Sequence, residues 1–456
     1  MGKFMFTAVA LVAGTCWTAA ASDAWPQFRG VTGDGQVAAA GFPLDWSAEK
    51  NVAWNTAIPG TGWSQPIVWG DQVFVTTAIS EKGEKPKKLQ EGARDPSSMF
   101  MGPKDAPDTV YRWELHCLDL KTGSPTWQRR VAEQEPGIPT HPSNTYATET
   151  PATDGERVYL WLASIGKAYA FDLGGQPVWE VDLGVFPMTS NLGTGSSPIV
   201  VDGRVIVQSY NEKDSFVVAL DPKIGAELWK APRSKGTSWS TPFVWRTSAR
   251  SELITCGNGK VYAYAPQDGQ VLWEIGGIPS SFSASPAANA DTLFLGNNGP
   301  FSTAPLFAIK AGAAGDITLP KEKISTKDIA SSDAVRWWRL KSGPGMASAV
   351  VAGDLLYVPD GSILNCYDAQ TGERIYRERL PAGSDVVASP LLFDDKLLLL
   401  DEEGNGFVVQ TGREFKVLAS NKLEDVFWAS PAVAGESLLL RGVDRLYCIR
   451  ASRSTP

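Results

Sequence analysis

One sequence pattern recurs eight times along this chain and constrains its fold more than any other feature. The pattern opens with Ser-x-Pro or Ser-Pro, or with Ala349 in the place of the proline, followed by an alternating apolar strand, a Gly/Asp turn and a second strand. The opening positions are Pro66, Pro151, Pro198, Pro242, Pro286, Ala349, Pro390 and Pro431. Their successive spacings are 85, 47, 44, 44, 63, 41 and 41 residues, so two copies carry insertions and the others are nearly constant in length. Such a period, built from short strands, is typical of a repeat architecture.

Most copies end in a variant of the tail Asp-x-x-Thr-Gly-x-x-x-Trp, whose full form stands at residues 119–127. The glycine makes the turn between two outer strands, because it tolerates positive φ. The aromatic residue four positions later is expected to lie flat on the neighbouring sheet and lock the two together. The tryptophans predicted to have this docking role are Trp54, Trp127, Trp179, Trp229 and Trp273. A four-stranded sheet cannot bury both faces alone, so the repeats must close into a ring. The sequence therefore predicts an all-β, eight-bladed β-propeller of four-stranded antiparallel blades.

The last repeat lacks its outer strand. After Pro431 the chain supplies strands near 437–441 and 445–449 and then ends without a Thr-Gly-Trp tail. A matching strand stands near the N-terminus instead, at Asn51–Asn55. We predict that this N-terminal strand completes the last blade, because an unpaired edge strand would invite aggregation.

The first 21 residues have the features of a secretory signal peptide: Lys3, an apolar stretch over 4–14, and small residues at 19–21. That stretch is too short to span a bilayer. We expect cleavage there and a single propeller domain over 22–456, located in the periplasm or outside the cell. Lipid attachment at Cys16 is a second possibility, although Gly14-Thr15 makes a poor lipobox. Two polar insertions interrupt the repeat, at 79–110 and 311–334, and we favour disorder for the first.

The net charge limits the kinds of binding partner, and the cysteine positions bear on whether disulfides form. A net charge of −8 argues against nucleic acid or an anionic membrane surface. Three of the four remaining cysteines, Cys117, Cys366 and Cys448, share one repeat position, and Cys256 stands apart. This favours isolated buried thiols over an essential disulfide.

These motifs resemble the pyrroloquinoline-quinone-like, or quinoprotein-like, β-propeller repeat family, over almost the whole of 22–456. The segment Trp25-Pro-Gln-Phe-Arg-Gly30 and the stretch 140–151 are similar to a secreted branch of that family without assigned chemistry. Similar repeats also build BamB, an outer-membrane assembly lipoprotein that acts as a scaffold. The resemblance implies a non-catalytic binding or scaffold propeller with an envelope or extracellular protein or glycan partner, and we expect a monomer.

The same resemblance implies an alternative, a quinone-dependent alcohol or sugar dehydrogenase. Enzymes of that kind carry adjacent cysteines beside the cofactor, a carboxylate base, and calcium held by Glu, Asn and Asp oxygens. This chain has no Cys-Cys pair and only two histidines, His116 and His141. We therefore expect no catalytic residues, no metal and no cofactor. Pyrroloquinoline quinone with calcium belongs to the alternative alone.

Two sets of candidate ligand-binding residues precede the opening positions. Trp63, Trp239 and Trp428 each stand three residues before one of them. Together they form either an aromatic platform for a sugar, a peptide or a planar ring, or a plug packed in the channel, which we favour. A carbohydrate-binding propeller is thus a further alternative.

The second set is the polar stretch containing His141, Asn144, Tyr146 and Glu149. It is either a binding loop or a hydrogen-bonded loop anchor. Glu149 is notable because it takes a position held by serine in other repeats.

Overall fold

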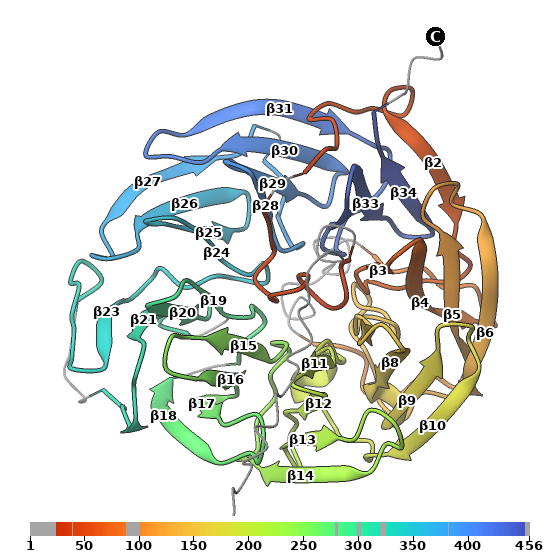
Figure 1. Cartoon of the computed structure of the whole chain (residues 1–456), viewed down its shortest axis with the longest axis horizontal. Helices are drawn as coiled ribbons and strands as arrows, with labels where there is room; N and C mark the ends of the chain where they lie inside the picture. The colour runs from red at the N-terminus through yellow and green to blue at the C-terminus, as the bar shows by residue number, and fades with distance from the viewer. Residues whose placement is uncertain are drawn as a thin grey trace, which may run out of the picture.

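The structure is a computed structural model that describes residues 24–38, 40–87, 101–278, 281–298, 302–319, 325–381 and 383–451. Within those ranges the chain forms eight β-sheets arranged around a common centre (Figure 1), with two short 3-10 turns, η2 (Ala163–Ile165) and η3 (Thr189–Asn191). The predicted eight-bladed propeller is confirmed. The predicted signal peptide, residues 1–21, lies outside the described residues.

Blades 1 to 4 follow one another along the chain. Blade 1 has β3 (Ile67–Trp69), β4 (Gln72–Ser80), β5 (Tyr111–Asp119) and β6 (Pro125–Gln134). Blade 2 has β7 (Ala152–Thr153), β8 (Arg157–Leu162), β9 (Lys167–Asp172) and β10 (Pro177–Asp182). Blade 3 has β11 (Ile199–Val201), β12 (Arg204–Ser209), β13 (Phe216–Leu220) and β14 (Glu227–Pro232). Blade 4 has β15 (Phe243–Arg246), β16 (Ser251–Cys256), β17 (Gly259–Tyr264) and β18 (Val271–Ile278).

Blades 5 to 8 complete the ring. Blade 5 has β19 (Ala287–Ala288), β20 (Thr292–Gly296), β21 (Leu306–Lys310) and β23 (Val335–Arg339). Blade 6 has β24 (Val350–Ala352), β25 (Leu355–Asp360), β26 (Ile363–Asp368) and β27 (Arg374–Arg379). Blade 7 has β28 (Leu391–Phe393), β29 (Lys396–Leu400), β30 (Asn405–Gln410) and β31 (Lys416–Lys422). Blade 8 has β32 (Ala432–Ala434), β33 (Ser437–Arg441) and β34 (Arg445–Ile449), with β2 (Val52–Ala57) as its outer strand.

Closure by the N-terminal strand is confirmed. β2 runs antiparallel to β34, with Trp54 opposite Cys448 and Ala57 opposite Arg445. In Figure 1 the orange-red β2 lies beside the dark blue β34, so the two ends of the chain share one sheet. The observed strand begins one residue later than the predicted 51–55 and extends two residues further.

Two blades carry a fifth strand that the repeat pattern did not predict. β1 (Gln36–Val37) pairs in parallel with β28 on the inner edge of blade 7. β22 (Gly315–Asp316), from the 311–334 insertion, pairs in parallel with β18 on the outer edge of blade 4. Both additions cover a sheet edge with the chain's own backbone.

A ring of hydroxyl groups explains why the repeat opens with Ser or Thr before its proline. In seven of the eight blades, the residue just before the opening position donates its backbone N–H to the corresponding side chain in the next blade, over 2.9 to 3.1 Å. The members in order are Gln65, Thr150, Ser197, Thr241, Ser285, Ser348, Ser389 and Ser430. At the seam between blades 8 and 1, Gln65 replaces the hydroxyl and its Nε2 donates to Pro431 O. The motif thus satisfies buried backbone donors around the axis.

The tail tryptophans lie against the turn glycine of the following blade. A Cβ added at Gly123 would come within 2.4 Å of the Trp54 ring, and Gly123 has φ +71, so only glycine fits there. Trp54 Nε1 also donates to Leu120 O of the same turn at 3.0 Å. The tryptophans with this arrangement, each with a carbonyl partner 2.9 to 3.2 Å away, are Trp54, Trp127, Trp179, Trp229 and Trp337.

Trp273 differs, because the turn glycine after β21 of blade 5, Gly312, has no aromatic ring against it. It is fully buried, and its Nε1 donates instead to Glu252 Oε2 of its own blade at 2.6 Å. Trp337 was not among the tryptophans assigned to docking.

Small buried residues stand opposite the docking aromatics. Cys448, Cys117 and Cys366 pair across the sheet with Trp54, Trp127 and Tyr376. Alanines take this place opposite the tryptophans of blades 2 to 5. The thiols are free and buried, and burial raises their pKa, to about 12 for Cys366. They are therefore packing residues of low reactivity.

The N-terminal segment 24–38 crosses the axis of the ring, as the red trace at the centre of Figure 1 shows. Trp25 exchanges backbone hydrogen bonds with Val68 of blade 1, and Leu392 N of blade 7 donates to Gly35 O. Between them the guanidinium of Arg29, fully buried, donates to Pro286 O and Ala349 O at 3.0 and 2.7 Å. The segment thereby links blades on opposite sides of the ring.

Candidate functional site

Two faces of the ring can be told apart. The loops that lead into the first strand of each blade define one face, which we call the loop face. The turns between first and second strands lie at the other end of the first strands, and we call that the turn face. The loop-face rim is formed by Trp63, Thr148, Gly195, Trp239, Ser283, Met346, Val387 and Trp428.

The three rim tryptophans are held differently. Trp63 is buried and stacks on the half-buried Trp428, with ring centroids 5.7 Å apart and planes at 22°. Trp239 is half-buried beside Gly195 and Thr148. All three indole N–H groups donate hydrogen bonds within the protein. Trp63 donates to Ser143 O, Trp428 to Glu402 Oε1, and Trp239 to Gly193 O. Only ring faces therefore remain for a ligand, and a binding role for these residues stays a prediction.

The polar stretch before blade 2 makes mostly internal bonds. His141 Nδ1 lies 2.7 Å from Ser143 Oγ. Asn144 Nδ2 donates to Leu192 O and Thr194 O, both at 3.1 Å, and so ties this loop to the next one. Tyr146 is buried, and its hydroxyl donates to Ile138 O at 3.0 Å. These three contacts are those of a loop anchor.

Glu149 is the exception in that stretch. Its side chain is only 4% exposed, and Oε1 has no hydrogen-bond partner in the described part of the chain. Burial raises the pKa of Glu149 to about 7, against the opposing effect of a hydrogen bond from Thr194. A carboxyl group at this depth titrates near neutral pH, which is a common property of functional sites.

Two arginines were missed from the sequence. Arg441 is fully buried at the end of β33, and its Nη1 and Nη2 donate to Ser64 O at 3.0 Å and Thr76 O at 2.6 Å. Burial lowers its pKa to about 9, and that of Arg29 to about 10. Both satisfy backbone carbonyls near the axis. For Arg29 the local signals were the Trp25–Gly30 motif that contains it and the unusual Gln65 at the seam, whose Oε1 accepts from Arg29 N.

The described ends of the 79–110 insertion are fixed to loops of other blades. Lys87 N donates to Pro142 O, and Gly102 N donates to Ser190 O, at 2.9 and 2.8 Å. Asn191 Nδ2 donates to Pro103 O at 2.9 Å. The predicted disorder covers the whole of 79–110; residues 79–87 and 101–110 are described and make these contacts, and residues 88–100 lie outside the described residues.

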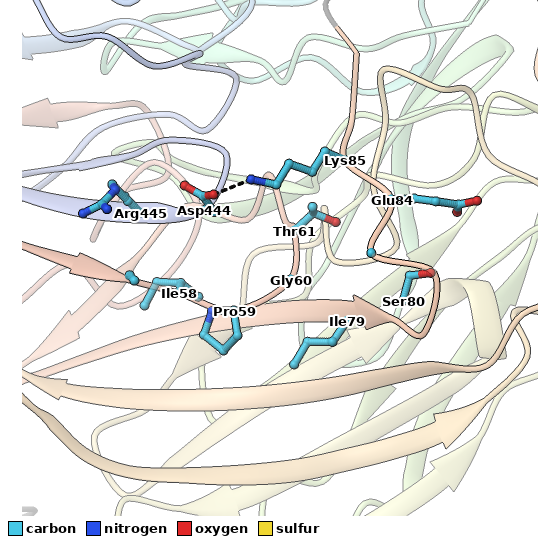
Figure 2. A pocket seen from close by; sticks show the side chains of 12 residues that line it. Ile58, Pro59, Gly60, Thr61, Ile79, Ser80, Glu84, Lys85, Asp444 and Arg445 are labelled. Carbon is cyan, nitrogen blue, oxygen red and sulfur yellow. Dashed lines mark hydrogen bonds and ion pairs between the residues drawn. The ribbon is translucent and has the colours of Figure 1, made fainter.

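A pocket of about 400 Å³ lies where blade 8 meets blade 1, under the start of this insertion (Figure 2). Ile58, Pro59 and Ile79 form its apolar side. Lys85 of the insertion reaches across it to Asp444 of the β33–β34 turn, with Nζ to Oδ2 at 2.6 Å. The insertion thus adds shape and charge to the loop face.

Among residues that the structure describes, no group of three His, Cys, Asp or Glu side chains is placed to hold a metal. Glu402, the other carboxyl at the rim, bonds to Trp428. In the same ranges, no helix is long and apolar enough to cross a membrane.

Comparison with known proteins agrees with this architecture. Residues 112–298 match the model of a family described as outer membrane protein assembly factor BamB. A 1-butanol dehydrogenase (cytochrome c) from Thauera butanivorans is 29% identical over 253 residues, which cover 50% of this chain and 34% of that protein. The chain therefore spans about a third of that relative's length.

Solved structures show the same fold at low identity. Quinohemoprotein alcohol dehydrogenase from Comamonas testosteroni has a TM-score of 0.62 at 11% identity, covering 96% of this chain and 82% of that one. BamB from Moraxella catarrhalis has a TM-score of 0.50 at 13% identity, covering 84% and 99%. The chain is thus an eight-bladed β-propeller, and its repeat, its docking tryptophans and these matches make it similar to propellers of the pyrroloquinoline-quinone-like repeat family.

Proposed function

We propose that this protein is a non-catalytic binding propeller, exported to the periplasm or beyond, that holds a protein partner on its loop face. The observation that carries the proposal is the way the loop face uses its side chains. Most polar side chains of the rim loops form hydrogen bonds within the protein, whereas the exposed positions carry the added insertion and apolar rim residues.

The loop face offers features of a protein-binding surface. Met346 is 41% exposed, and the rim positions of the blades on either side of it are the half-buried Ser283 and Val387. Lys85, Asp444 and Glu84 place charges beside an apolar pocket. An apolar centre with a polar margin is the usual composition of a specific interface. The rigid ring behind it lowers the conformational cost of binding.

Capture from an envelope extract tests this proposal with one surface variant and one control. Met346→Asp places a charge on the rim, and Ile224→Asp places the same charge on the exposed turn before β14, at the outer edge of blade 3. A scaffold working through its loop face should retain the same protein with the wild type and with Ile224→Asp, and lose it with Met346→Asp. Equal retention by both variants would contradict the assignment of the loop face.

A dehydrogenase remains the second candidate, because the 29% identity to the butanol dehydrogenase extends over half of this chain. Spectrophotometric titration with pyrroloquinoline quinone and calcium distinguishes the two. Stoichiometric binding with alcohol-dependent dye reduction would replace the scaffold proposal.

A further inference from the structure

A cavity of about 940 Å³ opens on the turn face, on the side of the ring opposite the rim tryptophans. The N-terminal segment forms one wall, through Gln27, Val31, Asp34 and Gln36. The rest is formed by the ends of first strands and the turns of blades 1 to 6, including Trp69, Asp154, Asp202, Arg246 and Asn289. Its volume lies at the upper end of the range of small-molecule sites, about 300–1,000 Å³.

The charges in this cavity are compensated. Asp154 has Arg157 at 3.8 Å, and Asp202 has Arg246 at 3.9 Å. Asp34 is near the buried Arg29, and burial still raises the pKa of this carboxyl above its usual range. The lining holds three carboxylates and one arginine, but each carboxylate has an arginine near it, which disfavours a small ion of either sign as the ligand.

Several polar groups in the lining are left unused by the protein. Gln27 Oε1 accepts from Val200 N at 3.0 Å, but its Nε2 has no partner in the described ranges. The same holds for Nε1 of the half-buried Trp69. The Arg246 side chain is 58% exposed and touches only Asp202 at long range. These are donors, and Asp202 beside them supplies acceptor oxygens, one of which already accepts from Gln267 at 3.3 Å.

Apolar surface accompanies these groups. Val31 is 48% exposed at the margin, and Phe243 and Trp69 line the wall. A ligand that fits must both donate and accept several hydrogen bonds, carry no net charge, and present carbon surface. A pyranose ring has these properties, since each hydroxyl both donates and accepts and the C–H faces are apolar.

We propose that this turn-face cavity binds a neutral saccharide unit, held between the N-terminal segment and the turns of blades 1 to 6. Gln27, Trp69 and Arg246 donate to sugar hydroxyls, and Asp202 accepts from them. The site is separate from the loop face, so it does not depend on the proposed protein-binding function.

Isothermal titration calorimetry with maltotriose, cellotriose, mannotriose and tri-N-acetylchitotriose tests the inference, with spermidine and citrate as charged probes. At least one neutral trisaccharide should bind the wild type. Arg246→Gln, and independently Val31→Glu, should each weaken it by tenfold or more. Arg130→Gln on the outer strand β6, which is similarly exposed, should leave affinity unchanged.

Three results would overturn the proposal: no neutral sugar binding at millimolar concentration, equal binding by Arg246→Gln, or tighter binding of spermidine or citrate. The loop-face variant Met346→Asp should bind the sugar normally, so failure here and failure of the scaffold proposal can be told apart.

Discussion

Replacing Glu149 by glutamine should make the protein more stable, and increasingly so as the pH rises. The carboxyl is buried with Oε1 unpaired, and its pKa is raised from 4.5 to about 7 in the folded chain. Between these two values the folded state holds a proton that the unfolded state has released. The unfolding free energy of the wild type therefore falls as pH rises through this window.

The size of the effect follows from the two pKa values. At about 1.4 kcal/mol per pKa unit, the step from 4.5 to about 7 corresponds to about 3 kcal/mol. Glutamine has nearly the same shape, keeps an acceptor for Thr194 and never ionises. The stability difference between Glu149→Gln and wild type should therefore grow by about 3 kcal/mol between about pH 4 and pH 8.

Urea unfolding at one-unit pH intervals measures this difference directly, with the denaturant slope checked for two-state behaviour. Glu156→Gln is the matched control, because that carboxylate is 71% exposed in the same blade and should show no such trend. A flat difference between Glu149→Gln and wild type across the pH range would show that the carboxyl is solvated or paired, and the reasoning would be wrong.

Three further changes probe the ring. Ser389→Ala leaves the buried N–H of Ser348 in blade 6 without its acceptor and should lower the unfolding free energy, measured in urea, by about 1–3 kcal/mol. Ser234→Ala, at an exposed site, should change it by no more than about 0.5 kcal/mol. Similar costs for both would disprove a structural role for the hydroxyl ring. Trp54→Phe keeps an aromatic ring against Gly123 and should lower the unfolding free energy by about 1 kcal/mol. Trp54→Ala should lower it by about 3–5 kcal/mol and speed proteolysis near β2. Equal effects would mean that the indole does not lock the seam. Cys256, whose pKa burial raises to about 12, should resist a thiol reagent at pH 8 until the protein is unfolded; rapid labelling of the native protein would contradict its burial.

The number of blades and the closing strand could be predicted because both follow from short sequence motifs that recur in each repeat. Each Ser/Thr–Pro opening and each Thr-Gly turn performs its task within its own blade or the next, so even the irregular Ala349 could be placed by register. Trp337 was not assigned to docking, because the 311–334 insertion separates it from the rest of its repeat.

The candidate site was less predictable, because its contacts join distant segments without any shared motif. The stack of Trp63 on Trp428 spans the seam between the first and last blades. The path of Arg29 across the axis, and the missing partner of Glu149, depend on how loops from different blades meet. Residue type identified Glu149 as unusual, but only burial gives it a pKa near neutrality.

Closure by the N-terminal segment also sets the order in which this molecule can be assembled. Gly35 bonds to Leu392, and Asn55 to Arg445, 390 residues further along the chain. Trp25 can pair with Val68 early, but β1 and β2 have no sheet partner until β28 and β34 exist. Contacts of such sequence separation make folding slow and leave sheet edges exposed in incomplete chains. A chain truncated before its last blade would lose that blade and also the partner of β2, so assembly should be all-or-none and should need protection until the final strands arrive.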